Sequence, residues 1–194
     1  MELCAGDDVF TVDDLRDLSD LVARTWLDAA DRDWSALAGT LDWTCLATAD
    51  HAVDCVYAPA FFLASQRTDG YPDAGETLEL GERATPARLV ESLRIATRIL
   101  SAVVTTAATD ERAAIFRTPP MTAGPADFAP RGALELALHS HDVCTGLGVA
   151  FEPAADVARR LRDHTVRWPM WSGAWGELPR TDDAWADLLA GSGR

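Results

Sequence analysis

Residues 131–148 read RGALELALHSHDVCTGLG, a stretch in which leucine, alanine and valine are interspersed with ionisable side chains at helical spacing. The pattern predicts a helix from about Arg131 to Thr145. Gly146 and Gly148 are placed to end it, because glycine readily adopts the left-handed backbone that closes helices. Other segments of the chain show the same kind of pattern, so the predicted class of the fold is helical.

Glu135 and His139 are predicted to share one face of this helix. Residues advance by about 100° each along an α-helix, so a spacing of four places these two side chains about 40° apart. Asp142 returns to within about 20° of Glu135, whereas His141 lies roughly 200° round the helix from His139 and should not share its site. A carboxylate and an imidazole between apolar neighbours need partners, because burying them alone is costly.

A further histidine, His51, is expected on a helix that Thr44 caps and that runs to about Gln66. The other residues on its helix face are small or apolar: Ala47, Cys55, Ala58 and Phe62. Such a face suits an inward-facing imidazole. If the two helices face each other, His51, Glu135 and His139 form a ligand set for a divalent metal, a type of site known in helical bundles. Three ligands leave a coordination position open for water, thiol or substrate.

The same residues also have ordinary structural interpretations. A glutamate and a histidine four residues apart often form a helix-stabilising pair, and a core histidine is usually hydrogen-bonded within the fold. Arg131 and Arg167 are candidate anchors for a carboxylate-bearing partner or cofactor, although exposed arginines are usually only solvated. Cys55 follows His51 by one turn and is within reach of a metal, but a buried free cysteine more often packs as a small hydrophobe.

Two other helix starts stand out in the sequence. Thr11 and Asp14 form a capping-box pattern for a first helix that fades near Asp31. The pair Thr85-Pro86 is a strong start for a third helix, because proline is welcome at the first helical position.

The remaining segments are expected to be loops, one helix and a tail. Long loops are predicted at 68–81 and 118–130, and a further helix from about Pro153 to Arg167. The tryptophan-rich tail is expected to pack over the other helices rather than line a substrate entrance. No strand pattern of useful length is present. We therefore predict an all-α fold, an up-down four-helix bundle with an additional C-terminal helix, as a single domain over 1–194.

Composition narrows the classes of function. The chain has 194 residues and a formal net charge of −14, which disfavours nucleic-acid and anionic-membrane partners because these need a basic patch. All 17 basic residues are arginine, which excludes a Schiff-base lysine or a Walker A lysine. The N-terminal residues MELCAGDDVF lack an apolar signal core, and the four cysteines form no CxxC pair. A cytoplasmic protein with reduced thiols is therefore expected.

Three segments of the chain form a recognisable combination: Trp43-Thr44 with His51 eight residues after the tryptophan, residues 135–146 (ELALHSHDVCTG), and the closing residues 187–194 (DLLAGSGR). Together they resemble the mycothiol-dependent maleylpyruvate isomerase family of DinB-like metal-binding bundles. The resemblance covers nearly the whole chain in the right order, without the C-terminal domain of the isomerases themselves. It implies a DinB-like four-helix bundle whose metal ligands are His51, Glu135 and His139. These are the same three residues that the helix faces bring together.

The resemblance also implies an activity. We expect a metal-dependent thiol S-transferase or isomerase, with zinc as the metal and mycothiol as the thiol cosubstrate. The metal would stabilise the thiolate of a thiol that is otherwise mostly protonated at neutral pH. The thiolate would then attack a small electrophilic metabolite. One departure from the family is that Asp50 and Asp54 put negative charge beside His51, where its members are mostly apolar.

Three rival functions are left open at this point. Two histidines and a carboxylate also form the ligand set of non-haem iron oxygenases, although those sites usually lie on a β framework. A non-enzymatic metal-binding bundle is the second rival. The third is a metal-independent or repurposed DinB-like enzyme of specialised metabolism. The substrate is not determined by the sequence, and a homodimer is left open.

Overall fold

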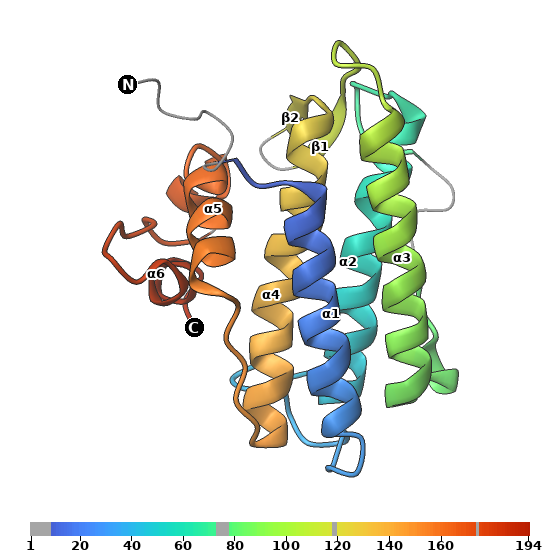
Figure 1. The fold of residues 1–194 in the computed structure, drawn as a ribbon, viewed down its shortest axis with the longest axis vertical. Helices are drawn as coiled ribbons and strands as arrows, with labels where there is room; N and C mark the ends of the chain where they lie inside the picture. Colours follow the sequence, from blue (N-terminus) through green and yellow to red (C-terminus); the bar gives the residue numbers. More distant parts are fainter. Residues whose placement is uncertain (1–8, 73–77, 118–119, 174) are drawn as a thin grey trace.

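The computed structural model describes residues 9–72, 78–117, 120–173 and 175–194. Four long helices lie side by side (Figure 1): α1 (Val12–Asp28), α2 (Cys45–Ser65), α3 (Pro86–Thr106) and α4 (Phe128–Leu147). Two shorter helices follow: α5 (Ala155–Thr165) packs beside α4, and α6 (Ala184–Gly191) packs against α5. Single 3-10 turns lie in the connections: η1 (Gly81–Arg83), η2 (Pro125–Asp127) and η3 (Pro169–Ser172). The described chain is mainly helical, as the sequence predicts.

Three of the four long helices begin at a threonine that caps them. The Thr11 hydroxyl accepts a hydrogen bond from the backbone N–H of Asp14, whose carboxylate accepts one in return from the N–H of Thr11 at 2.8 Å. Thr44 and Thr85 cap α2 and α3 through their own hydroxyls. These caps satisfy N–H groups that the first helical turn leaves without an intrahelical partner. The three predicted helix starts are confirmed.

The last turns of α4 pack closely against the segment that precedes α2. A Cβ atom at Gly146 would lie 2.3 Å from the carbonyl oxygen of Leu37 and 2.5 Å from Sγ of Cys45, so only glycine fits there. The helix runs through Gly146, and Gly148 closes it with a left-handed φ of 66°. The predicted helix end is therefore confirmed for Gly148, whereas Gly146 lies inside the helix and allows the close packing.

Helices α2 and α3 run in the same direction, and α1 and α4 run in the opposite one (Figure 1). The start of α2 lies beside the start of α3, where the Asp50 carboxylate accepts hydrogen bonds from the N–H groups of Leu80 and Gly81 at 2.8–3.0 Å. The connection between the two helices therefore returns along the length of the molecule. An up-down bundle would have α3 run opposite to α2, and this expectation was wrong. The long crossover between them lets these two successive helices run parallel.

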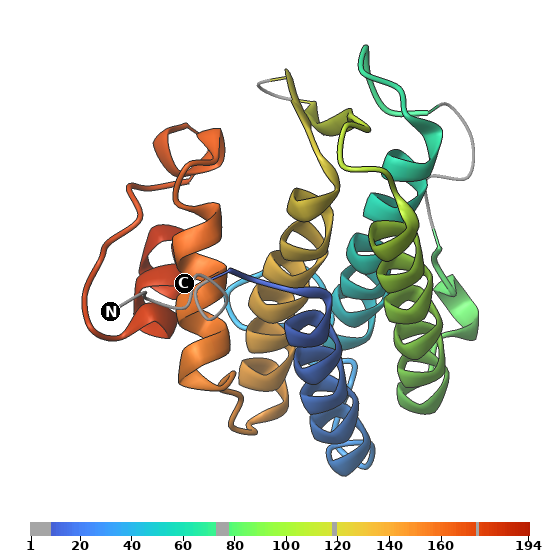
Figure 2. The ribbon, with the colours of Figure 1, turned by 45° about the horizontal axis from the view of Figure 1, so that its top comes forward.

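A short antiparallel hairpin precedes α4 at one end of the molecule (Figures 1 and 2). Strand β1 (Ala113–Arg117) pairs with β2 (Pro120–Ala123), with an irregularity between Ala114 and Phe116. The N–H of Ala114 also donates to the carbonyl oxygen of Arg67 after α2, at 2.7 Å. The prediction of no strand was wrong here, because strands of four and five residues show almost no periodicity.

Helix α4 also starts earlier than predicted, at Phe128 rather than near Arg131. Pro130 lies in its first turn, where the missing N–H is harmless because no carbonyl partner is available for it. The prolines of this segment, which suggested a loop up to residue 130, are therefore compatible with a helix start.

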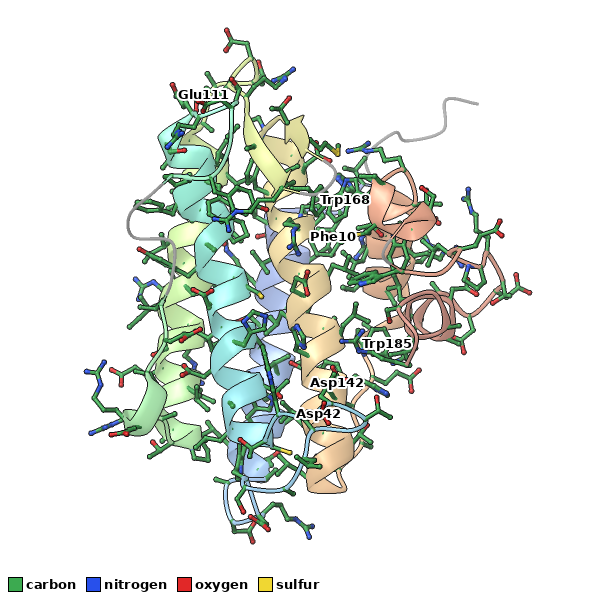
Figure 3. The ribbon with its side chains drawn as sticks, turned by 180° about the vertical axis from the view of Figure 1, so that it is seen from behind. Phe10, Asp42, Glu111, Asp142, Trp168 and Trp185 are labelled. Atoms are coloured by element: carbon green, nitrogen blue, oxygen red, sulfur yellow. The ribbon has the colours of Figure 1, made fainter. Side chains whose placement is uncertain are left out.

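The segment after α5 packs most of its tryptophans against the rest of the chain, Trp168 and Trp185 among them (Figure 3). Trp168 and Trp185 are 1% and 8% exposed, and their rings lie edge-on to Phe116 and Phe151, respectively. This arrangement agrees with the prediction that the tail packs. In the part of the chain that the structure describes, no helix is long and apolar enough to cross a membrane.

Candidate functional site

Helix α2 directs His51 toward α4. The imidazole is half-buried and lies edge-on to two rings, that of Trp43 at a centroid distance of 5.2 Å and that of His139 at 5.1 Å. Burial lowers the pKa of His51, and the neighbouring His139 lowers it further. At neutral pH the His51 imidazole is therefore uncharged and keeps a nitrogen lone pair for a ligand.

Cys55 lies one helical turn after His51 on the same face of α2. Its Sγ is 3.4 Å from Nε2 of His51. Burial raises the pKa of the Cys55 thiol well above its usual value, and the negative charge of Glu135 adds to this effect. In the absence of a cation, Cys55 is a protonated thiol.

Glu135 on α4 is held between Arg131 and His139. The Arg131 guanidinium donates to Oε1 of Glu135, and Oε2 of Glu135 lies 3.5 Å from Nε2 of His139. The Arg131 and Glu135 side chains are only 20% and 13% exposed. Burial raises the pKa of Glu135, but Arg131 and His139 outweigh it and hold the pKa well below its usual range. Glu135 is therefore ionised and paired.

Asp142 contacts the opposite edge of His139. Its Oδ2 lies 3.5 Å from Nδ1 of His139, a buried nitrogen that makes no hydrogen bond with the described residues. Burial lowers the pKa of His139, but Asp142 and Glu135 outweigh it and the pKa is raised. Arg194 in turn holds Asp142, with Nε 3.0 Å from Oδ1 and Nη2 2.8 Å from Oδ2. The segment after α6 thus fixes a carboxylate behind the imidazole.

Two groups of side chains in the described part bring three donor atoms within 4.8 Å of one another. They are His51–Cys55–His139 and His51–Asp54–Glu79. The structure therefore brings together His51 and His139, as the sequence predicts, and places Glu135 beside His139. Cys55, rather than Glu135, completes the first group.

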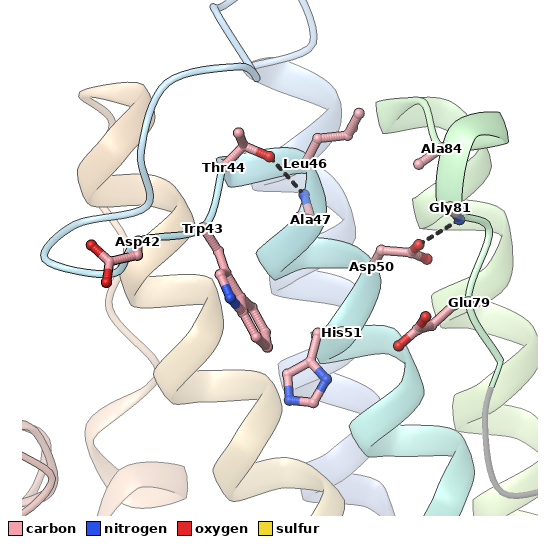
Figure 4. A pocket seen from close by; sticks show the side chains of 10 residues that line it. All are labelled: Asp42, Trp43, Thr44, Leu46, Ala47, Asp50, His51, Glu79, Gly81 and Ala84. Carbon is pink, nitrogen blue, oxygen red and sulfur yellow. Dashed lines mark hydrogen bonds between the residues drawn. The ribbon is translucent and has the colours of Figure 1, made fainter.

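Cavities open on two sides of His51. One, of about 520 Å³, is lined by Trp43, Asp50 and Glu79 among others; Figure 4 shows the Trp43 ring on one side of the imidazole and the Glu79 carboxylate on the other. The second, of about 330 Å³, has Cys55, Arg131 and aromatic side chains in its wall. A small molecule in either cavity would lie beside His51.

The other predicted site residues have different outcomes. Arg131 lines the smaller cavity, but its charge is already paired with Glu135. Arg167 is 56% exposed and pairs with Asp127, and it lines neither cavity. His141 faces Trp185 of α6 at a centroid distance of 5.9 Å, away from His139, as the helix geometry predicts.

Sequence reasoning missed the role of the carboxylates that flank His51. Asp54 accepts a hydrogen bond from the N–H of Leu78 at 2.6 Å, and Asp50 accepts hydrogen bonds from the N–H groups of Leu80 and Gly81. These contacts fasten the end of the crossover to α2, and Glu79, between the bonded residues, lines the larger cavity. The only signal in the sequence was the unusual charge of both positions, because their partners are distant backbone groups. Tyr71 and Arg117 in the smaller cavity gave no signal.

Comparisons of this chain with protein-family models, with curated proteins and with solved structures found no match. The geometry around His51 and His139 and the sequence resemblance are therefore the basis for assigning a function.

Proposed function

We propose that this protein is a metal-dependent enzyme in which His51 and His139 hold a divalent cation, with zinc as the expected metal. The enzyme would activate a thiol for attack on a small electrophilic metabolite, as a transferase or an isomerase. The observation that carries the proposal is the convergence of His51, Cys55 and His139, with donor atoms within 4.8 Å of one another, beside two cavities. Mycothiol as the thiol, and Glu135 as a third ligand, rest on the sequence resemblance.

The donor chemistry fits a zinc-type cation. Imidazole nitrogen, thiolate sulfur and carboxylate oxygen are the ligands that zinc binds in proteins. The lowered pKa of His51 keeps this imidazole neutral and able to coordinate. Asp142 lies behind Nδ1 of His139, and a carboxylate at that place orients a metal-bound imidazole and raises its basicity.

A cation bound here would lower the pKa of a coordinated thiol and keep it as the nucleophilic thiolate at neutral pH. The protein's own groups would do the rest. Trp43 and Glu79 border the larger cavity on either side of His51 (Figure 4). Arg131, which is already neutralised by Glu135, contributes an N–H-rich wall to the smaller one. These walls would orient the thiol and the electrophile and limit access of water.

The test is metal analysis of the purified protein beside single variants. The wild type should carry close to one metal per chain, and His51→Ala or His139→Ala should lose it. His141→Ala is the matched control, because this residue faces Trp185. A wild type that is metal-free after purification and binds no added zinc would overturn the proposal.

Turnover is the second part of the test. The wild type should consume mycothiol in the presence of an activated aryl chloride, and His139→Ala should not. Metal binding without turnover on a panel of electrophiles would favour a non-enzymatic metal-binding protein.

A metal-independent enzyme is the second candidate, and one observation favours it. Glu135, the carboxylate expected as a ligand, already has Arg131 as a partner. Full activity of a wild type stripped of metal by a chelator would establish this candidate. For either candidate function we propose a cytoplasmic location. The free thiols of Cys45, Cys55 and Cys144 suit a reducing compartment.

A further inference from the structure

Cys55 is the side chain placed to serve as a third metal ligand beside the two histidines. Its sulfur faces His51 directly, with 3.4 Å between Sγ and Nε2, and it also lines the smaller cavity. The donor atoms of His51, Cys55 and His139 all lie within 4.8 Å of one another. Three side chains on two helices therefore converge on one point.

The separation between Cys55 and His51 matches the geometry of a tetrahedral zinc site. With Zn–N near 2.0–2.1 Å and Zn–S near 2.3 Å, a nitrogen and a sulfur bound to the same ion lie roughly 3.5 Å apart. The observed 3.4 Å lies at that value. The donor nitrogen of His139 lies at most 4.8 Å from the donor atoms of His51 and Cys55. A small movement of the side chains would bring all three to coordinating distance of one ion.

Glu135 is placed differently. Its Oε1 accepts a hydrogen bond from the Arg131 guanidinium, and both side chains are largely buried. Neither group of converging donor atoms in the described residues includes Glu135. Drawing this carboxylate away from Arg131 would leave a buried positive charge without its partner, which is costly.

We propose that Cys55, as its thiolate, is the third protein ligand of the metal, in place of Glu135. The inference rests on the proposed metal site. On binding, the S–H bond of Cys55 breaks, the sulfur keeps the electron pair and donates it to the cation, and the proton passes to solvent. The resulting set of two nitrogens and one sulfur selects thiophilic cations such as zinc and cobalt over magnesium and manganese, and it leaves one coordination position open for the thiol cosubstrate.

Cobalt(II) titration of the full chain tests this assignment, because cobalt bound to a thiolate shows a sulfur-to-metal charge-transfer band in the near ultraviolet. The wild type should show this band, and Cys55→Ser should lose it. Cobalt affinity should fall by at least about tenfold in Cys55→Ser. Losing a residue that only hydrogen-bonds to a metal ligand already costs about 10–100-fold, and losing a ligand should cost no less. Cys144→Ala is the matched control, since Cys144 is also a buried free thiol.

A second measurement uses the wild type alone and needs no variant. X-ray absorption of the zinc-loaded protein should show one sulfur ligand at about 2.3 Å beside the nitrogen ligands. A zinc coordination shell without sulfur would overturn the inference.

The remaining outcomes separate this inference from the proposed function. Cobalt bound without the charge-transfer band, or with a band that survives Cys55→Ser, would overturn the role of Cys55 and leave the metal site standing. Loss of cobalt binding in Glu79→Gln but not in Cys55→Ser would also overturn it and would point to the His51–Asp54–Glu79 group. No cobalt or zinc binding by the wild type would overturn both.

Discussion

The ion pair between Arg131 and Glu135 should make α4 sensitive to the loss of one charge. The two side chains are 20% and 13% exposed, one turn apart on the helix, and Arg131 also lies over the Phe116 ring at 5.0 Å. Glu135→Gln keeps the shape of the side chain and removes its charge. The guanidinium is then left in a poorly solvated place without a counter-ion.

The size of the effect follows from the burial of the pair. Removing one partner of a fully buried ion pair costs about 3–5 kcal/mol, and the residual exposure and the amide oxygen of glutamine reduce this to about 2–4 kcal/mol. For a chain of this length, that free energy corresponds to a fall in Tm of about 4–16 °C. Adding Arg131→Met should restore most of the lost stability, because the unpaired charge is then gone.

The assay is urea unfolding of chelator-treated protein, with Glu91→Gln on the exposed face of α3 as a control. This control should change the unfolding free energy by less than about 0.5 kcal/mol.

The stability that the charge of Glu135 contributes should depend on pH. The pKa of Glu135 is depressed in the folded protein, so its stabilisation is complete above the unfolded value near 4.3 and is lost as the pH falls toward the folded pKa. Glu135 also helps to raise the pKa of His139, so the stability difference between wild type and Glu135→Gln should grow as the pH falls through the titration of His139. It should shrink again below about pH 4.3, where Glu135 itself becomes protonated. A cost below about 1 kcal/mol, or a double variant no more stable than Glu135→Gln, would refute the reasoning.

Two further predictions concern the packing around α4. Arg194→Gln should lower the unfolding free energy by about 1–3 kcal/mol, because Asp142 loses its charged hydrogen-bond donor. It should also weaken zinc binding by about tenfold through the loosened His139, whereas Arg167→Gln, at an exposed pair, should change neither. Gly146→Ala gains about 1 kcal/mol of helix propensity, but its Cβ would meet backbone 2.3 Å away. We expect a net loss of about 1–3 kcal/mol by chemical denaturation, and a stabilised variant would contradict the close approach seen at this glycine.

Local features of the sequence predicted the helices and part of the site. The caps at Thr11, Thr44 and Thr85 depend on hydrogen bonds within one helical turn, so they are visible in a few consecutive residues. The separation of His139 from His141 follows from helix geometry alone, and the structure places His141 against Trp185. These results need no knowledge of the neighbouring helices.

The partners of the site residues could not be predicted in this way. Glu135 and His139 share a face as expected, but the sequence did not reveal that Glu135 would pair with Arg131 one turn earlier, because a glutamate can turn toward either neighbour. The sequence could not decide whether Cys55 packs in the core or contacts a metal. That depends on α4, which places His139 beside His51. The short hairpin from Ala113 gave too few residues for a periodic signal.

By itself, the sequence determined the helical class of this protein, where most of its helices begin, and which histidine shares a face with Glu135, since these depend on interactions a few residues apart. Only the tertiary structure decided that α2 and α3 run parallel, with the crossover fastened to Asp50, and that Cys55 lies close to both His51 and His139. The physical reason is the same in both cases. Contacts between distant segments depend on how whole helices pack, and packing is set by the shape of the complete core rather than by any short stretch of residues.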